Sequence, residues 1–344
     1  MVTTAAYAPS FVSSRRAITV IRARRAVGRT LITIARSIAI FVPVFLLATF
    51  VTFTLRAVSG LSPARIQLGE EATPAAVHRI ESTWGLNRPF LAQYWTWFDN
   101  VLHGNLGRSW SNGVPVSQLI GDGLTVSLSV VTLSLVIGVV FGFGFGTLAA
   151  LRRTTWIDRS ITAVLTVFSV MPPFVVGIVL VEVFAVGLRW FPSGGFVPFG
   201  AGAAPWLSHL LLPALALSFD TVAIVARQLR AGLIGAYQEN YVTGALVRGL
   251  GPRRIFFRHV LRNGAGPALT VLGLQFPALI GGSVVTEWIF GLQGFGRFAN
   301  DAAQAGDVPS VQGVLVVSIV LVVTFNLIVN VVLGKVTPAA QRGV

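Results

Sequence analysis

Long apolar stretches alternate with short polar connections along most of this chain of 344 residues. Several stretches reach the ~20 residues that a helix needs to cross a hydrocarbon core about 30 Å thick. Backbone polar groups in lipid are satisfied only in helices or closed barrels, and unbroken apolar runs favour helices. The pattern therefore predicts an all-α polytopic membrane protein with six transmembrane helices, at Ser37–Leu55, Leu124–Ala150, Ile161–Trp190, His209–Val225, Pro267–Ile289 and Ser310–Leu333.

Composition agrees with the pattern, because 54% of the residues are hydrophobic and only 11% are charged. A soluble domain of this length needs more charge to cover its surface. The absence of cysteine excludes a disulfide framework and a thiolate metal site.

The basic residues predict the topology. With both termini in the cytoplasm, nineteen of the 26 Lys and Arg residues fall on the inner side, as the positive-inside rule requires. This distribution explains the net charge of +14 better than nucleic-acid binding does, since no basic stripe interleaves with aromatic residues in a soluble module.

The predicted spans divide the chain into segments of different character. Residues 1–36 form a basic arm with seven arginines and no acid, which fits a cytoplasmic arm on anionic headgroups more simply than a mitochondrial transit peptide. The first transmembrane helix covers residues 37–55. The other segments are an extracytoplasmic stretch rich in Trp and Tyr at 56–123, a five-helix core at 124–334 and a cytoplasmic tail at 335–344.

Within the spans, small residues and prolines indicate special packing. Gly138, Gly142, Gly144 and Gly146 predict a face where another helix approaches closely. Pro172 and Pro173 remove two backbone donors and predict a kink that acts as a hinge or a pathway wall, or occurs in a static bundle.

Three acids lie in or near the spans, where charge is costly. Glu182 and Asp220 each have an arginine seven residues later, Arg189 and Arg227, which predicts pairing on one helix face. Glu287 lacks such a partner, so we expect it to face a cavity or to cap a neighbouring backbone. We therefore take Pro172, Pro173 and Glu287 as possible pathway or gating residues.

No catalytic or metal-binding constellation is visible in the sequence. The four histidines show no metal-ligand spacing, and neither a nucleophile elbow nor a zinc-peptidase motif occurs. We therefore expect no enzymatic activity, no cofactor and no metal in this chain. A membrane enzyme would need a clustered nucleophile and base, and a self-sufficient secondary transporter a charged relay on facing helices.

The predicted cytoplasmic loop at 226–264 is basic and contains its own helix signals. Residues 239–247 suit a short helix, and Gly249 to Gly251 permit a tight bend. Gly251 can cap a second helix with Pro252 at its first position, where a missing N–H breaks no bond. The resulting amphipathic knob must bury its apolar face against membrane, bundle or partner.

The loop resembles the EAA loop of ABC importer permeases, through Glu239, Ala245 and Gly249, followed by Arg258-His259 and Arg262-Asn263. The variant is similar to that of the B-type subunit of the oligopeptide, dipeptide and nickel branch. Other segments resemble the same branch: Trp84-Gly-Leu-Asn-Arg-Pro89, Gly104-Asn-Leu-Gly107, Phe191-Pro-Ser-Gly-Gly195 and Val311-Gln-Gly313. The chain departs from the family pattern at Thr337-Pro338 and at Asp220, where the family is normally apolar.

The resemblance implies a type I ABC importer permease fold in the plasma (inner) membrane of a bacterium. It also implies a second, C-type permease subunit, two ATP-binding subunits that hold ATP and Mg, and an extracytoplasmic solute-binding protein. Di- or oligopeptides are the expected substrates, with a nickel chelate or another small solute as the alternative. The expected ATPase-coupling residues are Glu239, Tyr241, Ala245, Gly249, Leu250, Arg253, Ile255, Phe256, Arg258, His259, Arg262 and Asn263.

Overall fold

The computed structural model describes residues 41–336, except for 56, 59–61 and 70. The predicted arm at 1–36, the start of the first span and residues 337–344 of the predicted tail lie outside the described residues. The chain divides into two units, residues 1–48 and 49–344. Residues 41–48 of the first unit are helical, and the second unit is described below.

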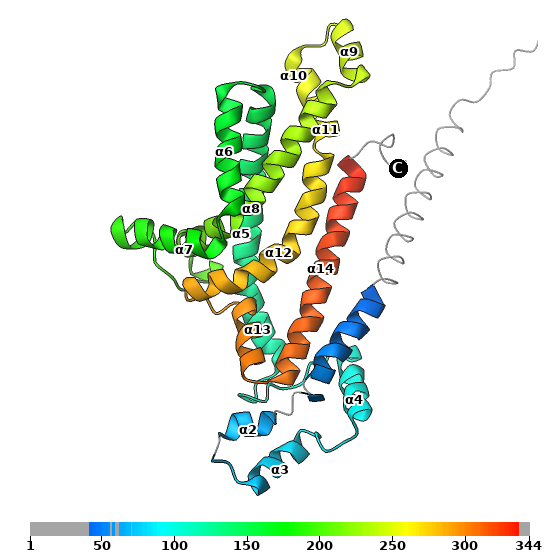
Figure 1. The fold of residues 1–344 in the computed structure, drawn as a ribbon, viewed down its shortest axis with the longest axis vertical. Coiled ribbons are helices and arrows are strands. Elements are labelled where there is room, and N and C mark those ends of the chain that lie inside the picture. Colours follow the sequence, from blue (N-terminus) through cyan, green and yellow to red (C-terminus); the bar gives the residue numbers. More distant parts are fainter. Residues whose placement is uncertain (1–40, 56, 59–61, 70, 337–344) are drawn as a thin grey trace, which may run out of the picture. The chain divides into compact units, whose positions relative to one another are not determined.

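The second unit is helical, and its described residues contain no strand beyond an isolated bridge between Arg108 and Pro115. Three short helices precede the core, and the core itself consists of longer helices with a small helical insertion (Figure 1). Their bounds are α2 Pro63–Leu68, α3 Pro74–Thr83, α4 Phe90–Leu102, α5 Val116–Leu151, α6 Trp156–Val170, α7 Pro173–Leu180, α8 Ala203–Tyr237, α9 Asn240–Val247, α10 Pro252–Ile255, α11 Leu261–Gly264, α12 Gly266–Ile289, α13 Phe295–Gln304 and α14 Val308–Val336.

Four of these helices, α5, α8, α12 and α14, are long and apolar enough to cross a membrane. They lie at the second, fourth, fifth and sixth predicted spans, and a shorter apolar helix at Phe41–Leu55 lies at the first. Two predicted boundaries were wrong, because α5 already begins at Val116 and α8 continues to Tyr237. Hydropathy detects only the apolar part of a helix, and both helices extend beyond it with polar residues.

The third predicted span, Ile161–Trp190, is not one kinked helix. The helices at Trp156–Val170 and Pro173–Gly187 meet at an angle of 102°, and Figure 1 shows α7 directed sideways from α6. Met171 is extended, with ψ 119°, as expected for a residue that precedes proline. Pro172 and Pro173 therefore end one helix and start the next.

The glycines of α5 form the predicted packing face against α8. A Cβ at Gly138, Gly142 or Gly146 would collide with Thr221, Val225 or Ala226 of α8. Gly144 does not belong to this face, because nothing lies within 4 Å of a Cβ added there. In lipid there is no hydrophobic driving force between helices, so helices associate through close packing. Glycine favours this because it lets two backbones approach each other.

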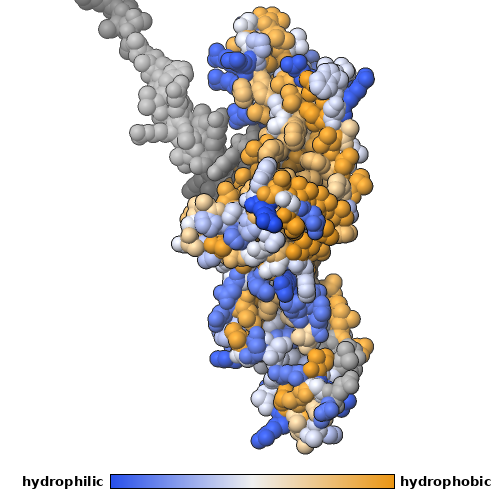
Figure 2. Space-filling model, turned by 90° about the vertical axis from the view of Figure 1, so that its left-hand side faces the viewer, coloured by the Kyte–Doolittle hydropathy of each residue, from blue (hydrophilic) through white to orange (hydrophobic). Residues whose placement is uncertain are grey.

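The surface in Figure 2 is apolar over the middle of the long helices and more hydrophilic toward both ends. Exposed apolar side chains occur within the long helices, such as Val136, Val140 and Phe141 of α5. An apolar surface of this extent is what helices present to lipid or to other membrane subunits.

The segment before α5, predicted to be extracytoplasmic and called the outer segment below, is fastened to the start of α14 through Asp307. Its buried carboxylate accepts hydrogen bonds from the Ser109 hydroxyl, the Trp110 backbone N–H and the Ser310 hydroxyl and backbone N–H. The same carboxylate therefore caps α14 and holds the 109–110 turn, which gives the segment a fixed attachment to the core.

Candidate functional site

The loop between α8 and α12 consists of two helical pieces joined by a bend, as predicted. The first piece is α9, with Glu239 extended at its N-cap. In the second piece, α10 continues through a π-helical turn, η3 (Phe256–Val260), into α11. Gly251 caps α10 and Pro252 occupies its first turn.

The bend after α9 is a Schellman motif centred on Gly249, whose φ is +72°. The Gly249 N–H donates to the Leu246 carbonyl and the Leu250 N–H donates to the Ala245 carbonyl. These bonds satisfy carbonyls that the end of the helix would leave open. A residue with a side chain adopts the left-handed backbone conformation at a cost of roughly 1–2 kcal/mol. The bend therefore depends on glycine at position 249.

One face of the loop is anchored to the core. Val242, Ala245, Ile255 and Val260 are buried and pack with residues of α8 and α12. Beside this cluster, Gly264 lies so close to the backbone of Gly232 in α8 that a Cβ on either glycine would collide with the other. The loop is therefore fixed to α8 by close backbone contact as well as by apolar packing.

The other face of the loop is open and is both apolar and basic. Leu246, Val247 and Phe257 have exposed fractions of 58%, 84% and 66%. Four arginines around them are exposed as well: Arg253, Arg254, Arg258 and Arg262. Large apolar side chains clustered with positive charge on a polar loop indicate a contact surface for a partner with acidic residues.

The remaining predicted loop residues lie between these two faces. Phe256 is half-buried and meets Phe257 edge to face at 5.0 Å. Asn263 donates to the His259 carbonyl at 2.8 Å. The Tyr241 hydroxyl is buried without a hydrogen-bond partner among the described residues, and burial raises the pKa of Tyr241, so its phenol is neutral at physiological pH.

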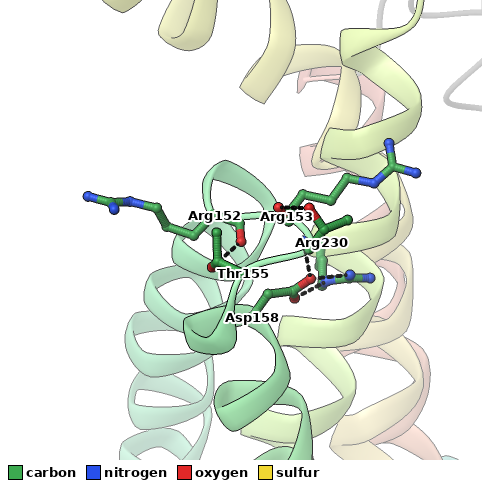
Figure 3. A network of polar contacts seen from close by, with 6 residues as sticks. Arg152, Arg153, Thr155, Asp158 and Arg230 are labelled. Atoms are coloured by element: carbon green, nitrogen blue, oxygen red, sulfur yellow. Dashed lines mark hydrogen bonds and ion pairs between the residues drawn. The ribbon is translucent and has the colours of Figure 1, made fainter.

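A partly buried ion pair ties α6 to α8 near the loop (Figure 3). Arg230 of α8 binds the Asp158 carboxylate through two nitrogens, with both N···O distances at 2.7 Å. The Thr154 N–H donates to the same carboxylate, and the Thr155 hydroxyl donates to the Arg152 carbonyl. A bidentate guanidinium–carboxylate pair fixes distance and orientation together, so the α5–α6 turn is held against α8.

The sequence reasoning missed Asp158 and counted Arg230 only toward topology. A signal was present, because Asp158 is the one acid among Arg152, Arg153 and Arg159 in a short connection. An isolated acid among basic residues at a helix start is a reasonable candidate for a specific ion pair.

Glu287 caps a neighbouring backbone, which was one of its two predicted roles. Its carboxylate is fully buried and accepts from the Ser127 and Ser283 hydroxyls and from the Arg297 N–H at the start of α13. Ser127 also accepts from the Phe295 N–H at 2.8 Å. The carboxylate thus joins α5, α12 and α13. Its hydrogen bonds to these helices do not support the predicted pathway or gating role.

The other intramembrane acids do not pair as expected. Asp220 accepts from the Gln275 amide of α12 at 3.3 Å, and no ion pair with Arg227 is present among the described residues. Glu182 and Arg189 likewise form no ion pair in the described part of the chain. Helix spacing alone does not create a pair where the backbone changes: Glu182 lies in the π-helical segment η1 (Val181–Gly187), and Arg189 has a φ of +56°.

Long apolar helices packed through glycine contacts define a multi-pass membrane protein, and its anchored loop has an exposed surface that is apolar and basic. Similarity to known protein families identifies the family. The chain belongs to the family described as binding-protein-dependent transport system inner membrane component, whose model matches residues 142–342. The related N-terminal family of these membrane components matches residues 29–131. The protein is therefore a multi-pass inner-membrane component of an importer that has further subunits.

Curated relatives match nearly the whole chain. It is 37% identical to the probable peptide ABC transporter permease protein y4tP of Sinorhizobium fredii, over 84% of this chain and 92% of the relative. It is 35% identical to a putative peptide transport system permease protein of Brucella abortus, over 87% and 95%. It is 32% identical to the glutathione transport system permease protein GsiC of Escherichia coli, over 90% and 98%.

A solved structure supports the fold. A chain of the inward-facing MetNI methionine ABC transporter superposes with a TM-score of 0.53 at 17% identity, covering 64% of this chain and 98% of that one. The type I importer permease fold is thus shared, while a third of the present chain extends beyond the matched part.

Proposed function

We propose that this chain is one of two different permease subunits of an ATP-driven importer of di- and oligopeptides. A C-type permease of the same fold would complete the translocation path, and two ATP-binding subunits would hold ATP and Mg and carry out hydrolysis. A solute-binding protein would deliver the peptide on the outer side. Both termini and the 226–264 loop would then be cytoplasmic.

The observation that carries the proposal is the two-faced loop. Its buried face follows α8, while Leu246, Val247, Phe257 and the exposed arginines offer a surface to a partner. Movement of ATP-binding subunits would reach the bundle through this contact and switch it between inward-facing and outward-facing states. The names of the relatives support peptides as the substrate class.

The Schellman bend gives a matched pair of variants for testing this coupling. Gly249→Val places a β-branched side chain at φ +72°, whereas Gly251→Val places it at φ −63° and ψ 151°, an ordinary extended conformation. Neither added Cβ meets an atom within 4 Å, so backbone strain is the variable. We expect Gly249→Val to reduce peptide import and peptide-stimulated ATP hydrolysis in proteoliposomes by about tenfold or more.

Gly251→Val should retain most of both activities, and both variants should assemble with the partner subunits. Unimpaired import with Gly249→Val would show that the loop is not the coupling element. Extraction in mild detergent tests the subunit composition, since a sister permease and ATP-binding subunits should co-purify. A chain that purifies alone and still moves peptide in liposomes would overturn the proposal.

A further inference from the structure

The outer segment contains a pocket of about 720 Å³ that the transport function above does not use. It lies between α3, α4, the turn at 105–113 and the first residues of α14, all within the second unit. Pockets that bind small molecules usually have volumes of about 300–1,000 Å³. The space is therefore large enough for a short peptide.

The apolar part of the pocket is built from indole rings. Trp84 and Trp110 stack with ring centroids 4.5 Å apart and an interplanar angle of 7°. Trp97, Leu106 and Pro309 continue the lining. Trp97 also carries a buried indole N–H without an acceptor among the described residues. Rigid aromatic surfaces of this kind bind apolar side chains with little loss of conformational entropy.

The polar part of the pocket is cationic and rich in amides. Arg88 and Arg108 line it together with Gln93 and Asn105, and no acidic side chain among the described residues does so. Arg108 donates to the Gly113 carbonyl, whereas Arg88 has no ion pair in the described part of the chain. The adjacent Asp307 carboxylate is buried, and its oxygens accept four hydrogen bonds from its neighbours, so it does not compete for Arg88.

We propose that this pocket binds a short free peptide, with its terminal carboxylate on Arg88 and an apolar side chain against Trp84 and Trp110. A guanidinium binds a carboxylate through two charge-assisted hydrogen bonds. The Gln93 amide already donates to the Leu86 and Arg88 carbonyls, and the Asn105 amide oxygen already accepts from the Gly107 N–H, so the arginines carry the polar recognition. Two arginines and no acid disfavour a cationic ligand, although indole rings alone would accept one. The inference rests on the proposed peptide importer and adds a peptide site on the permease itself.

The test uses the complete importer in nanodiscs, without binding protein and without ATP. The probe is radiolabelled alanyl-phenylalanyl-alanine with a free carboxylate, compared with the same tripeptide ending in a carboxamide, in an equilibrium binding assay. We expect saturable binding of the free acid and at least tenfold weaker binding of the carboxamide.

Two variants and two controls locate the site. Arg88→Gln and Trp110→Phe should each weaken binding of the free acid, about tenfold for Arg88→Gln and several-fold for Trp110→Phe. Arg79→Gln removes an exposed arginine of α3 that does not line the pocket, and Trp95→Phe changes an exposed indole of α4 outside it. Both controls should bind the tripeptide as the unaltered protein does.

Peptide import with the binding protein present separates failure of this inference from failure of the proposed function. If the importer moves the tripeptide but binding is absent, or is unchanged in Arg88→Gln, the pocket is not a peptide site. Equal affinity for acid and carboxamide would overturn the role of Arg88. Binding only when the binding protein is added would make the pocket a protein-docking surface and would also overturn the proposal.

Discussion

Two buried carboxylates hold the bundle together at different ends of its helices, and their hydrogen-bonding capacity is satisfied in different ways. Asp158 lies at the start of α6, beside the loop region, and faces the guanidinium of Arg230. Glu287 lies at the end of α12, next to α13, and is surrounded by hydroxyl and backbone donors. The nearby Arg297 guanidinium does not join it, but lies over the Trp288 ring at 4.6 Å and near Asp301.

The difference shows what each carboxylate does. A single bidentate ion pair connects two elements, so Asp158 sets the spacing of α6 and α8. Several neutral donors from different elements connect more of the fold at once, so Glu287 acts as a junction of α5, α12 and α13. The Arg230 side chain is 33% exposed, whereas Glu287 has no exposed surface. Water can therefore hydrate Arg230 when Asp158 is lost, but it has less access to the donors around Glu287.

The largest effect is expected from Glu287→Ala. It leaves the Arg297 N–H and the Ser127 hydroxyl without their acceptor, whereas Ser283 can still donate to the Ile280 carbonyl. Each unsatisfied buried group costs about 1–3 kcal/mol. We expect the free energy of unfolding to fall by about 3 kcal/mol or more, seen as a large decrease in the apparent Tm of the purified importer. An unchanged Tm would mean that the cap of α13 is not needed for the fold.

A smaller effect is expected from Asp158→Ala. Arg230 loses both hydrogen bonds, but it is partly exposed and can be hydrated. We therefore expect the free energy of unfolding to fall by about 2 kcal/mol, less than the 3–5 kcal/mol for breaking a fully buried pair. The matched variant Arg159→Ala changes the neighbouring exposed residue and should leave the Tm unchanged. Equal Tm values for Asp158→Ala and Arg159→Ala would contradict the structural role of the ion pair.

The smallest effect is expected from Ser127→Ala, which removes one donor to Glu287 and the acceptor of the Phe295 N–H. The expected cost is about 1–2 kcal/mol, because the carboxylate keeps its other donors. Ser129→Ala is the control, since that hydroxyl bonds only to the Thr125 carbonyl of its own helix. A Ser127→Ala protein as stable as the control would show that α5 does not depend on the junction.

The loop between α8 and α12 was predictable because its signals are local. Gly249, Gly251 and Pro252 determine a helix end, a bend and a helix start within four residues, and each acts through its own backbone geometry. The α5 glycine face was predictable for the same reason, apart from Gly144, whose outward direction follows from the helix position it occupies.

The buried polar contacts were not predictable in detail, because their partners are distant in the sequence. Arg230 and Asp158 are 72 residues apart, and Ser109 and Asp307 are 198 residues apart. The proline pair predicted a kink within one span, whereas the structure has two helices at 102° to each other, and nothing in the sequence specifies that angle. That angle depends on how α6 and α7 pack against α8, which is a tertiary property.

The close contact between Gly232 and Gly264 joins the loop to α8 near the C-terminal end of that helix. From Gly232 back to Ala203 the helix extends about 44 Å at 1.5 Å per residue. Each degree of rotation about the contact would move the far end by about 0.8 Å, so a tilt of a few degrees at the loop is magnified across the membrane. Pro213 lies within that long arm and cannot donate to its hydrogen-bond ladder, which places a point of lower stiffness far from the contact with the loop.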